Sequence, residues 1–204
     1  MFDWRRAGSW CGLAGPSIFL ITWLAAIAST PGYRVFEHWV SDLGVGGGAA
    51  FFNGGVIVAG LLTIPFAVTL ALVLQTSRLG LVGSAVLIVA SVALIGVGVF
   101  TENAGRMHGI MSISFFASVL LALILLSWPL YRFPAFGPWV GLTNAVLVLV
   151  GLLMAAVSSS GPFTETVVVL MVAAWSIVVA WKLRMYLCVT LRQQALGPEA
   201  QPNR

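Results

Sequence analysis

The sequence predicts an all-α integral membrane protein, a single bundle of six transmembrane helices with both termini in the cytoplasm. Composition argues against a soluble globule, because 60% of the 204 residues are hydrophobic and only 8% are charged, whereas soluble domains carry about 25% charged residues. The mean hydropathy of +1.03 agrees with this. Six apolar segments recur between short polar loops, and each has about the 20 residues that a helix needs to cross a bilayer.

The first predicted transmembrane helix covers residues 8–28. Arg5 and Arg6 precede this apolar segment, and Thr30-Pro31-Gly32 ends it. A secretory signal peptide is the alternative, because basic residues, an apolar core and Ala26-Ile27-Ala28 resemble its three regions. The apolar core is longer than the usual ~7–15 residues of a signal peptide. We therefore expect a helix that is retained.

Five further spans follow, separated by turns that contain proline, glycine or charged residues. They are predicted over residues 49–74, 79–100, 107–128, 137–157 and 163–181. The third is rich in Val and Ile, which suits a membrane helix because the bilayer forces backbone hydrogen bonds inside the segment. We expect residues 1–186 to form one domain and residues 187–204 to form a polar cytoplasmic tail, with no fixed structure from Gly197 onward.

The distribution of basic residues predicts the orientation of these spans. The loops on one side contain only Arg34 and Arg106, and the other side holds the remaining basic residues: Arg5, Arg6, Arg78, Arg132, Lys182, Arg184, Arg192 and Arg204. Since basic residues accumulate on the cytoplasmic side, both termini are predicted to be cytoplasmic. Basic residues spread over chain ends and loops do not form the single basic face that nucleic acid binds, so we predict no nucleic-acid partner.

Polar residues concentrate in the three loops that are predicted to face outward. Glu37–Gly44 is the densest run, and the candidate site residues from all three loops are Ser41, Asp42, Asn53, Glu102, Arg106, His108 and Glu165. Ionisable groups at a membrane boundary are costly and commonly face a cavity, which indicates an extracytoplasmic site. We assign acid/base work to Asp42 and His108, with Glu102 beside them as a third catalytic candidate. The substrate-binding candidates are Ser41, Asn53, Arg106 and Glu165.

Several of these polar residues also have a purely structural alternative. Ser41 and Asp42 are the residue types of a helix N-cap and first turn, and Thr164-Glu165 repeats that pattern before the sixth span. His108 at headgroup depth would be satisfied by a hydrogen bond to a backbone carbonyl. Arg34 and Glu37 have the spacing of a solvated ion pair that contributes little stability.

Metal binding is a further alternative for the same residues. His108, Asp42 and Glu102 are the residue types of a three-ligand zinc site with one open position. The sequence contains no H-E-x-x-H or other tight ligand spacing. We therefore predict no metal, and the cofactor is unknown.

One ordered set of motifs runs through most of the chain. It begins with Ser41-Asp42-Leu43-Gly44-Val45-Gly46 and Phe52-Asn53, continues with Gly96-Val97-Gly98-Val99-Phe100, Glu102 and His108, and ends with Gly161 and Glu165. In this order the motifs resemble the DUF998 family of six-helix prokaryotic membrane proteins, over residues 10–185. The resemblance implies a multi-pass protein of the prokaryotic plasma membrane, with Ser41, Asp42, Asn53, Glu102, His108 and Glu165 as site residues. The activity of that family is uncharacterised.

Three functional hypotheses follow from this site. The leading one is a membrane enzyme or binding protein for a lipid or amphiphile. The second is a small ion- or proton-coupled transporter, although the apolar midplane of the last four spans argues against it. The third is an accessory subunit that recognises another membrane protein. The expected partners are membrane lipids, and either a protein partner or a second copy of the chain, for which Gly8-x-x-x-Gly12 and Gly137-x-x-x-Gly141 allow close helix contacts.

Overall fold

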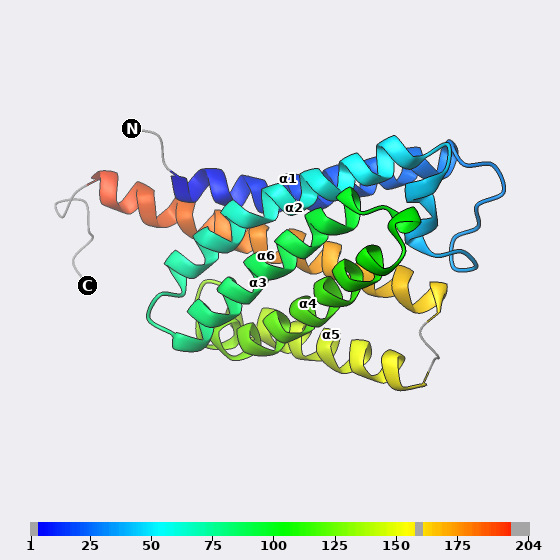
Figure 1. Cartoon of the computed structure of the whole chain (residues 1–204). Helices are drawn as coiled ribbons and strands as arrows, with labels where there is room; N and C mark the ends of the chain where they lie inside the picture. The colour runs from blue at the N-terminus through cyan, green and yellow to red at the C-terminus, as the bar shows by residue number, and fades with distance from the viewer. Residues whose placement is uncertain (1–3, 158–160, 197–204) are drawn as a thin grey trace.

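The described part of the chain folds into six α-helices and two short 3₁₀ helices (Figure 1). The structure is a computed structural model and describes residues 4–157 and 161–196, among which there is no β-strand. The elements in chain order are α1 (Trp4–Ala28), η1 (Val40–Val45), α2 (Ala49–Val73), α3 (Arg78–Val99), η2 (Glu102–Ala104), α4 (Arg106–Arg132), α5 (Gly137–Val157) and α6 (Pro162–Leu196).

Five of these helices, α1, α2, α3, α4 and α6, are long and apolar enough to cross a membrane. The sixth, α5, is apolar over the shorter stretch Gly137–Leu153. The chain is therefore a helical membrane protein, as its composition predicts. Each predicted span coincides with one helix, and α6 continues past residue 181 to Leu196. This extension follows from the sequence, since no proline or glycine interrupts it between Phe163 and Leu196.

Helices that follow one another in the chain pack side by side from α1 to α5, and α6 returns to pack against α1 (Figure 1). The contact between α5 and α6 is much smaller than that between α4 and α5. The main core cluster joins α2, α3, α4, α5 and α6 around buried side chains such as Phe66, Leu126 and Leu183. A second cluster joins α1, α2 and η1 around Trp23, Leu43 and Phe52. The bundle is thus closed where α1 packs against both α2 and α6, and it is loosely packed between α5 and α6.

The small-residue motif of α1 is used inside the chain. A Cβ at Gly8 would overlap Thr69 of α2, and one at Gly12 would overlap the ring of Phe66 and lie 2.8 Å from Ala180 of α6. Glycine at both positions lets the three helices approach closely. At the other motif, Gly141 of α5 lies against the backbone of Tyr131 in α4. Three of these four glycines, Gly8, Gly12 and Gly141, therefore serve contacts within one chain.

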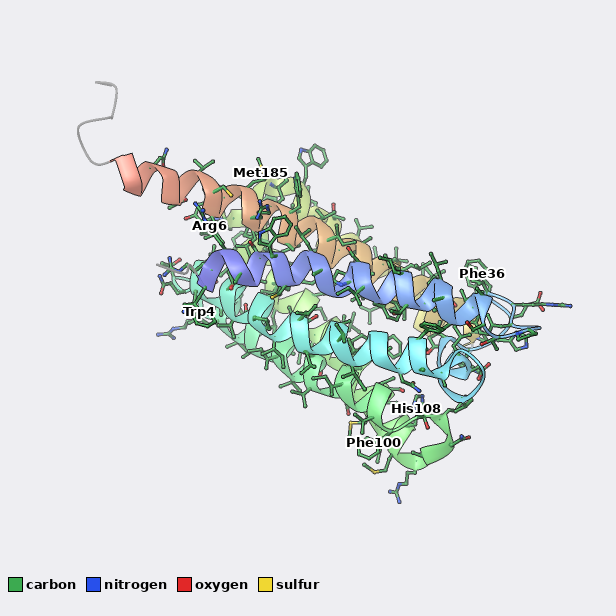
Figure 2. The ribbon with its side chains drawn as sticks, turned by 90° about the horizontal axis from the view of Figure 1, so that it is seen from above. Trp4, Arg6, Phe36, Phe100, His108 and Met185 are labelled. Atoms are coloured by element: carbon green, nitrogen blue, oxygen red, sulfur yellow. The ribbon has the colours of Figure 1, made fainter. Side chains whose placement is uncertain are left out.

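The two ends of the bundle differ in character. Phe36, Phe100 and His108 lie at one end, together with η1 and η2, and Trp4 and Arg6 lie at the other (Figures 1 and 2). At the Trp4 end the guanidinium of Arg184 in α6 lies 3.7 Å from the ring centroid of Trp10 in α1, a cation–π contact that ties the two helices together. The candidate site residues all belong to the opposite end.

Candidate functional site

The short helix η1 carries Ser41 and Asp42. Trp39 is the N-cap residue of η1, and its backbone N–H donates a 2.9 Å hydrogen bond to the Asp42 carboxylate. This is the reverse bond of a capping box, in which an acid at the third position satisfies the N-terminal donor. Asp42 therefore has a structural role in η1, whereas Ser41 is not the N-cap and is free to face the bundle.

Asn53 of α2 fixes the far end of η1. Its side-chain amide donates a 2.9 Å hydrogen bond to the carbonyl of Gly44, and its Oδ1 atom is buried without a partner among the described residues. A Cβ at Gly44 would lie 2.8 Å from that oxygen. The close approach of the two residues explains why glycine follows Leu43 here.

Glu165 connects η1 to the first turn of α6. One carboxylate oxygen accepts a 2.7 Å hydrogen bond from the backbone N–H of Val40. Thus the acid serves η1, 125 residues away in sequence, and is not a simple cap of its own helix. Tyr33, from the loop after α1, lies close by: burial, and then the charges of Glu165 and Asp42, raise the pKa of its phenol to about 12.

Two carboxyl groups meet where η1 and η2 touch. Burial is the first cause of a raised pKa at Glu102, followed by the charge of Asp42 and a hydrogen bond with the Asp42 side chain. The charge of His108 acts in the opposite direction. The neighbouring negative charge of Asp42 makes ionisation of Glu102 less favourable. Asp42 and Glu102 therefore interact directly where η1 meets η2.

His108 is held in the first turns of α4 by two contacts. Its Nδ1 atom lies 2.8 Å from the carbonyl oxygen of Phe100, and its Nε2 atom lies 3.3 Å from the hydroxyl of Ser112. Since a carbonyl oxygen only accepts, the proton of the neutral ring is on Nδ1, and Nε2 is an acceptor facing Ser112. The carbonyl contact that the structural alternative predicted for His108 is present, and it leaves the second nitrogen available.

Two spaces adjoin these residues. An interior cavity of about 110 Å³ lies among α1, α2, α3, α4, α6 and η1, and a cleft of about 490 Å³ lies among α4, α5 and α6. Ser41, Ser112 and Glu165 line both spaces, while His108 and Trp39 line the cleft. The remaining walls of the cleft are largely apolar and include Ile113, Phe116, Leu120, Leu147, Val168 and Met171.

The structure divides the predicted site residues into two sets. Ser41, His108 and Glu165 border the cleft. Asp42, Glu102, Asn53 and Arg106 line neither space: the first three support the η1 region, and Arg106 is exposed at the first position of α4. The exposed Arg34–Glu37 ion pair, at 3.0 Å, is present as its spacing predicted. Within residues 4–157 and 161–196, no group of three His, Cys, Asp or Glu side chains is arranged to hold a metal ion.

Sequence reasoning missed Ser112, Tyr33 and Trp39. Ser112 occurs in an apolar helix, where a single serine attracts little notice, but its spacing of four residues from His108 places both side chains on one helix face. Tyr33 precedes the predicted polar run and Trp39 lies within it, and both are residue types typical of the membrane interface. Only the fold brings Trp39 to the cleft and Tyr33 to Glu165.

Comparison with known proteins adds one finding. A family model described as "Protein of unknown function (DUF998)" matches residues 13–182, which is most of the chain. No curated protein and no solved structure matches the sequence.

Proposed function

Because the chain belongs to the DUF998 family, whose description assigns no function, we propose from its geometry that it binds an amphiphile. The polar head is held at Ser41, His108 and Glu165, and the hydrocarbon chain lies in the cleft between α4, α5 and α6. The carrying observation is the junction of polar and apolar surface: Ser41, Ser112 and Glu165 border a cleft whose other walls are mostly hydrocarbon. Its volume of about 490 Å³ lies within the range of about 300–1,000 Å³ usual for small-molecule sites.

The loose packing between α5 and α6 supports entry from the side. Leu147 and Gly151 of α5 face Val168 and Met171 of α6 across the cleft, and the described residues of the two helices make few other contacts. A ligand with a hydrocarbon chain would reach the cleft from the bilayer without passing through water. This favours a membrane lipid, or an amphiphile that partitions into the membrane, over a water-soluble substrate.

In this proposal all six helices cross the plasma membrane of a prokaryote, and the site faces outward. The 21 residues of α5 give a helix of about 31 Å at 1.5 Å per residue, which matches the ~30 Å hydrocarbon core. The start of α1 and the end of α6 lie at the same end of the bundle (Figure 1), as an even number of crossings requires. The excess of basic residues at that end supports a cytoplasmic position for both termini.

The predicted site residues keep distinct roles in the proposal. His108 exchanges a proton at the cleft, and the Asp42–Glu102 pair supplies acid/base capacity behind η1 without touching the ligand. Asn53 holds η1 in place. Arg106, exposed at the start of α4, is placed to attract an anionic headgroup.

Photo-crosslinking tests the proposal. Purified protein is reconstituted with a phospholipid that carries a photoactivatable group in its acyl chain, and crosslinked peptides are identified by mass spectrometry. We expect crosslinks to α4, α5 and α6 residues of the cleft. Gly151→Phe should reduce crosslinking at least fivefold, because a Cβ at Gly151 meets no atom within 4 Å and the ring would enter the cleft.

Gly54→Phe is the matched control, since Gly54 of α2 is exposed and also has open space around its Cβ. Equal crosslinking in the wild type and in both variants would exclude the cleft as the binding site. Native mass spectrometry of the purified protein adds an independent measurement. A co-purifying polypeptide with no lipid would favour an accessory subunit, and ion flux into liposomes would favour a transporter.

A further inference from the structure

Ser112 differs from other serines of the membrane helices. Ser84, Ser91 and Ser127 each donate a 2.8 Å hydrogen bond to the backbone carbonyl four residues earlier. This is the usual way for a hydroxyl to be satisfied in a helix. The Ser112 hydroxyl lies instead 3.3 Å from Nε2 of His108.

The environment of His108 determines which group is the donor and which is the acceptor in this contact. The carbonyl of Phe100 fixes the proton on Nδ1, so the Nε2 lone pair points at the Ser112 hydroxyl. A hydroxyl beside an acceptor nitrogen, with the ring oriented by a third group, is the arrangement that activates a serine nucleophile. Such contacts are often loose without a ligand and tighten when one binds.

The pair also lies at the junction where the head of the proposed ligand would be. Ser112 borders both the interior cavity and the cleft, and His108 borders the cleft. Ser41 borders the same two spaces and presents a second hydroxyl. An ester group lies at the same kind of boundary in a membrane lipid, between the polar head and the hydrocarbon chain.

We propose that Ser112 and His108 form a nucleophile–base pair that cleaves an ester bond of a membrane amphiphile. This rests on the proposed function, because the cleft must first bind the hydrocarbon chain. Ser112 Oγ attacks the ester carbonyl carbon while its proton passes to His108 Nε2. The hydroxyl of Ser41 donates to the oxyanion, the C–O bond breaks, and His108 gives the proton to the leaving alcohol. Water then attacks the acyl-serine with His108 as base, which releases a carboxylic acid and restores Ser112.

A fluorophosphonate with a long alkyl chain tests the nucleophile directly, since a serine displaces its fluoride only when a base activates the hydroxyl. We expect covalent labelling of the full-length protein at Ser112, located by peptide mass spectrometry. Ser112→Ala should lose the label completely. Ser41→Ala should slow labelling about a hundredfold, the usual effect of removing one oxyanion donor.

His108→Asn distinguishes the role of His108 as a base from its role in stabilising the fold. Asparagine retains an N–H for the Phe100 carbonyl and has no basic nitrogen. It should lower the labelling rate at least a hundredfold while the unfolding temperature stays near that of the wild type. Ser114→Ala, two positions along α4 and lining neither space, is the matched control and should label normally. Hydrolysis of p-nitrophenyl laurate should exceed that of the acetate at least tenfold, as expected for a substrate chain buried in an apolar cleft.

The two proposals fail in different ways. Crosslinking of the photoactivatable phospholipid without labelling of Ser112 would overturn ester cleavage and leave lipid binding intact. Labelling of a residue other than Ser112, or full labelling of the His108→Asn variant, would also overturn it. Loss of crosslinking in a protein that still labels at Ser112 would remove the phospholipid as ligand and support the nucleophile alone.

Discussion

The backbone N–H of Val40 donates a 2.7 Å hydrogen bond to the carboxylate of Glu165, although the two residues are 125 positions apart in the chain. This bond joins the start of η1 to the first turn of α6. It places Ser41, the next residue after Val40, at the wall shared by the interior cavity and the cleft. The position of Ser41 at the site therefore depends on a contact between the segment after α1 and the start of α6.

Removing that acceptor should destabilise the protein. Glu165→Ala leaves the Val40 N–H unsatisfied, and we expect it to lower the free energy of unfolding by about 1–3 kcal/mol. Glu165→Gln retains an oxygen acceptor and should cost less than half as much. Thermal unfolding in detergent measures both, with Glu37→Ala, which removes an exposed ion pair, as a control expected to change stability by less than about 1 kcal/mol. Equal losses in the Ala and Gln variants would contradict the assigned bond.

Stability should depend on pH through Glu102. Burial first, and then the charge and hydrogen bond of Asp42, raise the pKa of Glu102 above its ordinary value of 4.5. A raised pKa means that the folded state holds the proton more tightly than the unfolded chain. The stabilisation from this group is therefore fully present below pH 4.5 and is lost as the pH rises through the folded pKa.

Glu102→Gln should remove this loss. The unfolding temperature of the wild type, measured from pH 4 to pH 8, should fall more steeply than that of Glu102→Gln. Asp42→Asn should also flatten the curve, since it removes the neighbouring charge, although it weakens the bond to the Trp39 N–H. Parallel curves for the wild type and Glu102→Gln would contradict the raised pKa of Glu102.

Gly44 and Asn53 should behave as a coupled pair. Gly44→Ala places a Cβ 2.8 Å from Asn53 Oδ1, and this overlap should destabilise the protein by about 1–3 kcal/mol. Asn53→Ala alone loses the bond to the Gly44 carbonyl, which should cost about 1 kcal/mol. In the double variant the overlap is gone, so its loss should be smaller than the sum by at least about 0.5 kcal/mol. Strict additivity, measured by chemical unfolding in detergent, would speak against direct contact.

Gly12 of α1 should contribute to the stability of a single chain, without a second copy. Gly12→Ala places a methyl group against Phe66 and Ala180 and should lower stability by about 1–3 kcal/mol. Gly54→Ala, at an exposed helical position with open space, should be neutral or stabilise by up to about 1 kcal/mol. The comparison is made by thermal unfolding at two protein concentrations. A loss that depends on concentration would indicate that Gly12 packs between copies.

The proposed topology predicts which loops a membrane-impermeant maleimide reaches. With Cys11 and Cys188 replaced by serine, Asn103→Cys should react in intact cells, because the η2 loop is proposed to face outward. Gln75→Cys, in the turn between α2 and α3, should react only after the membrane is opened. Both positions are exposed, so a difference reports on sidedness rather than burial. The reverse pattern would show that the bundle has the opposite orientation in the membrane.

The helices were the part of the fold most accessible to sequence reasoning. Apolar segments of about 20 residues, ended by Pro31, by Arg78 or by the run near Pro162, specify helices because a bilayer leaves the backbone no other way to satisfy its hydrogen bonds. The end of α6 was less accessible. Charged residues after Trp181 suggest a tail, yet without proline or glycine the hydrogen-bonded turns continue to Leu196.

The site was predictable only in part. Ser41, His108 and Glu165 border the cleft, whereas Asp42 and Asn53 are engaged with the backbone of η1. The sequence shows that all five are polar residues in or beside the predicted outward loops. It does not show which of these side chains forms hydrogen bonds with the backbone, since that depends on the path of the chain between α1 and α2.

The amino-acid sequence alone is enough to establish that this is a helical membrane protein, where its helices lie, and that its polar residues collect on one side. These properties depend on composition and on local spacing, which act within single segments. Three further relationships follow from the packing of the bundle: Ser112 faces His108 beside a cleft, α5 and α6 are loosely packed, and Glu165 accepts a hydrogen bond from Val40. Those relationships depend on how helices distant in the chain approach one another, and the side-chain shapes that set this approach act only once the bundle has formed.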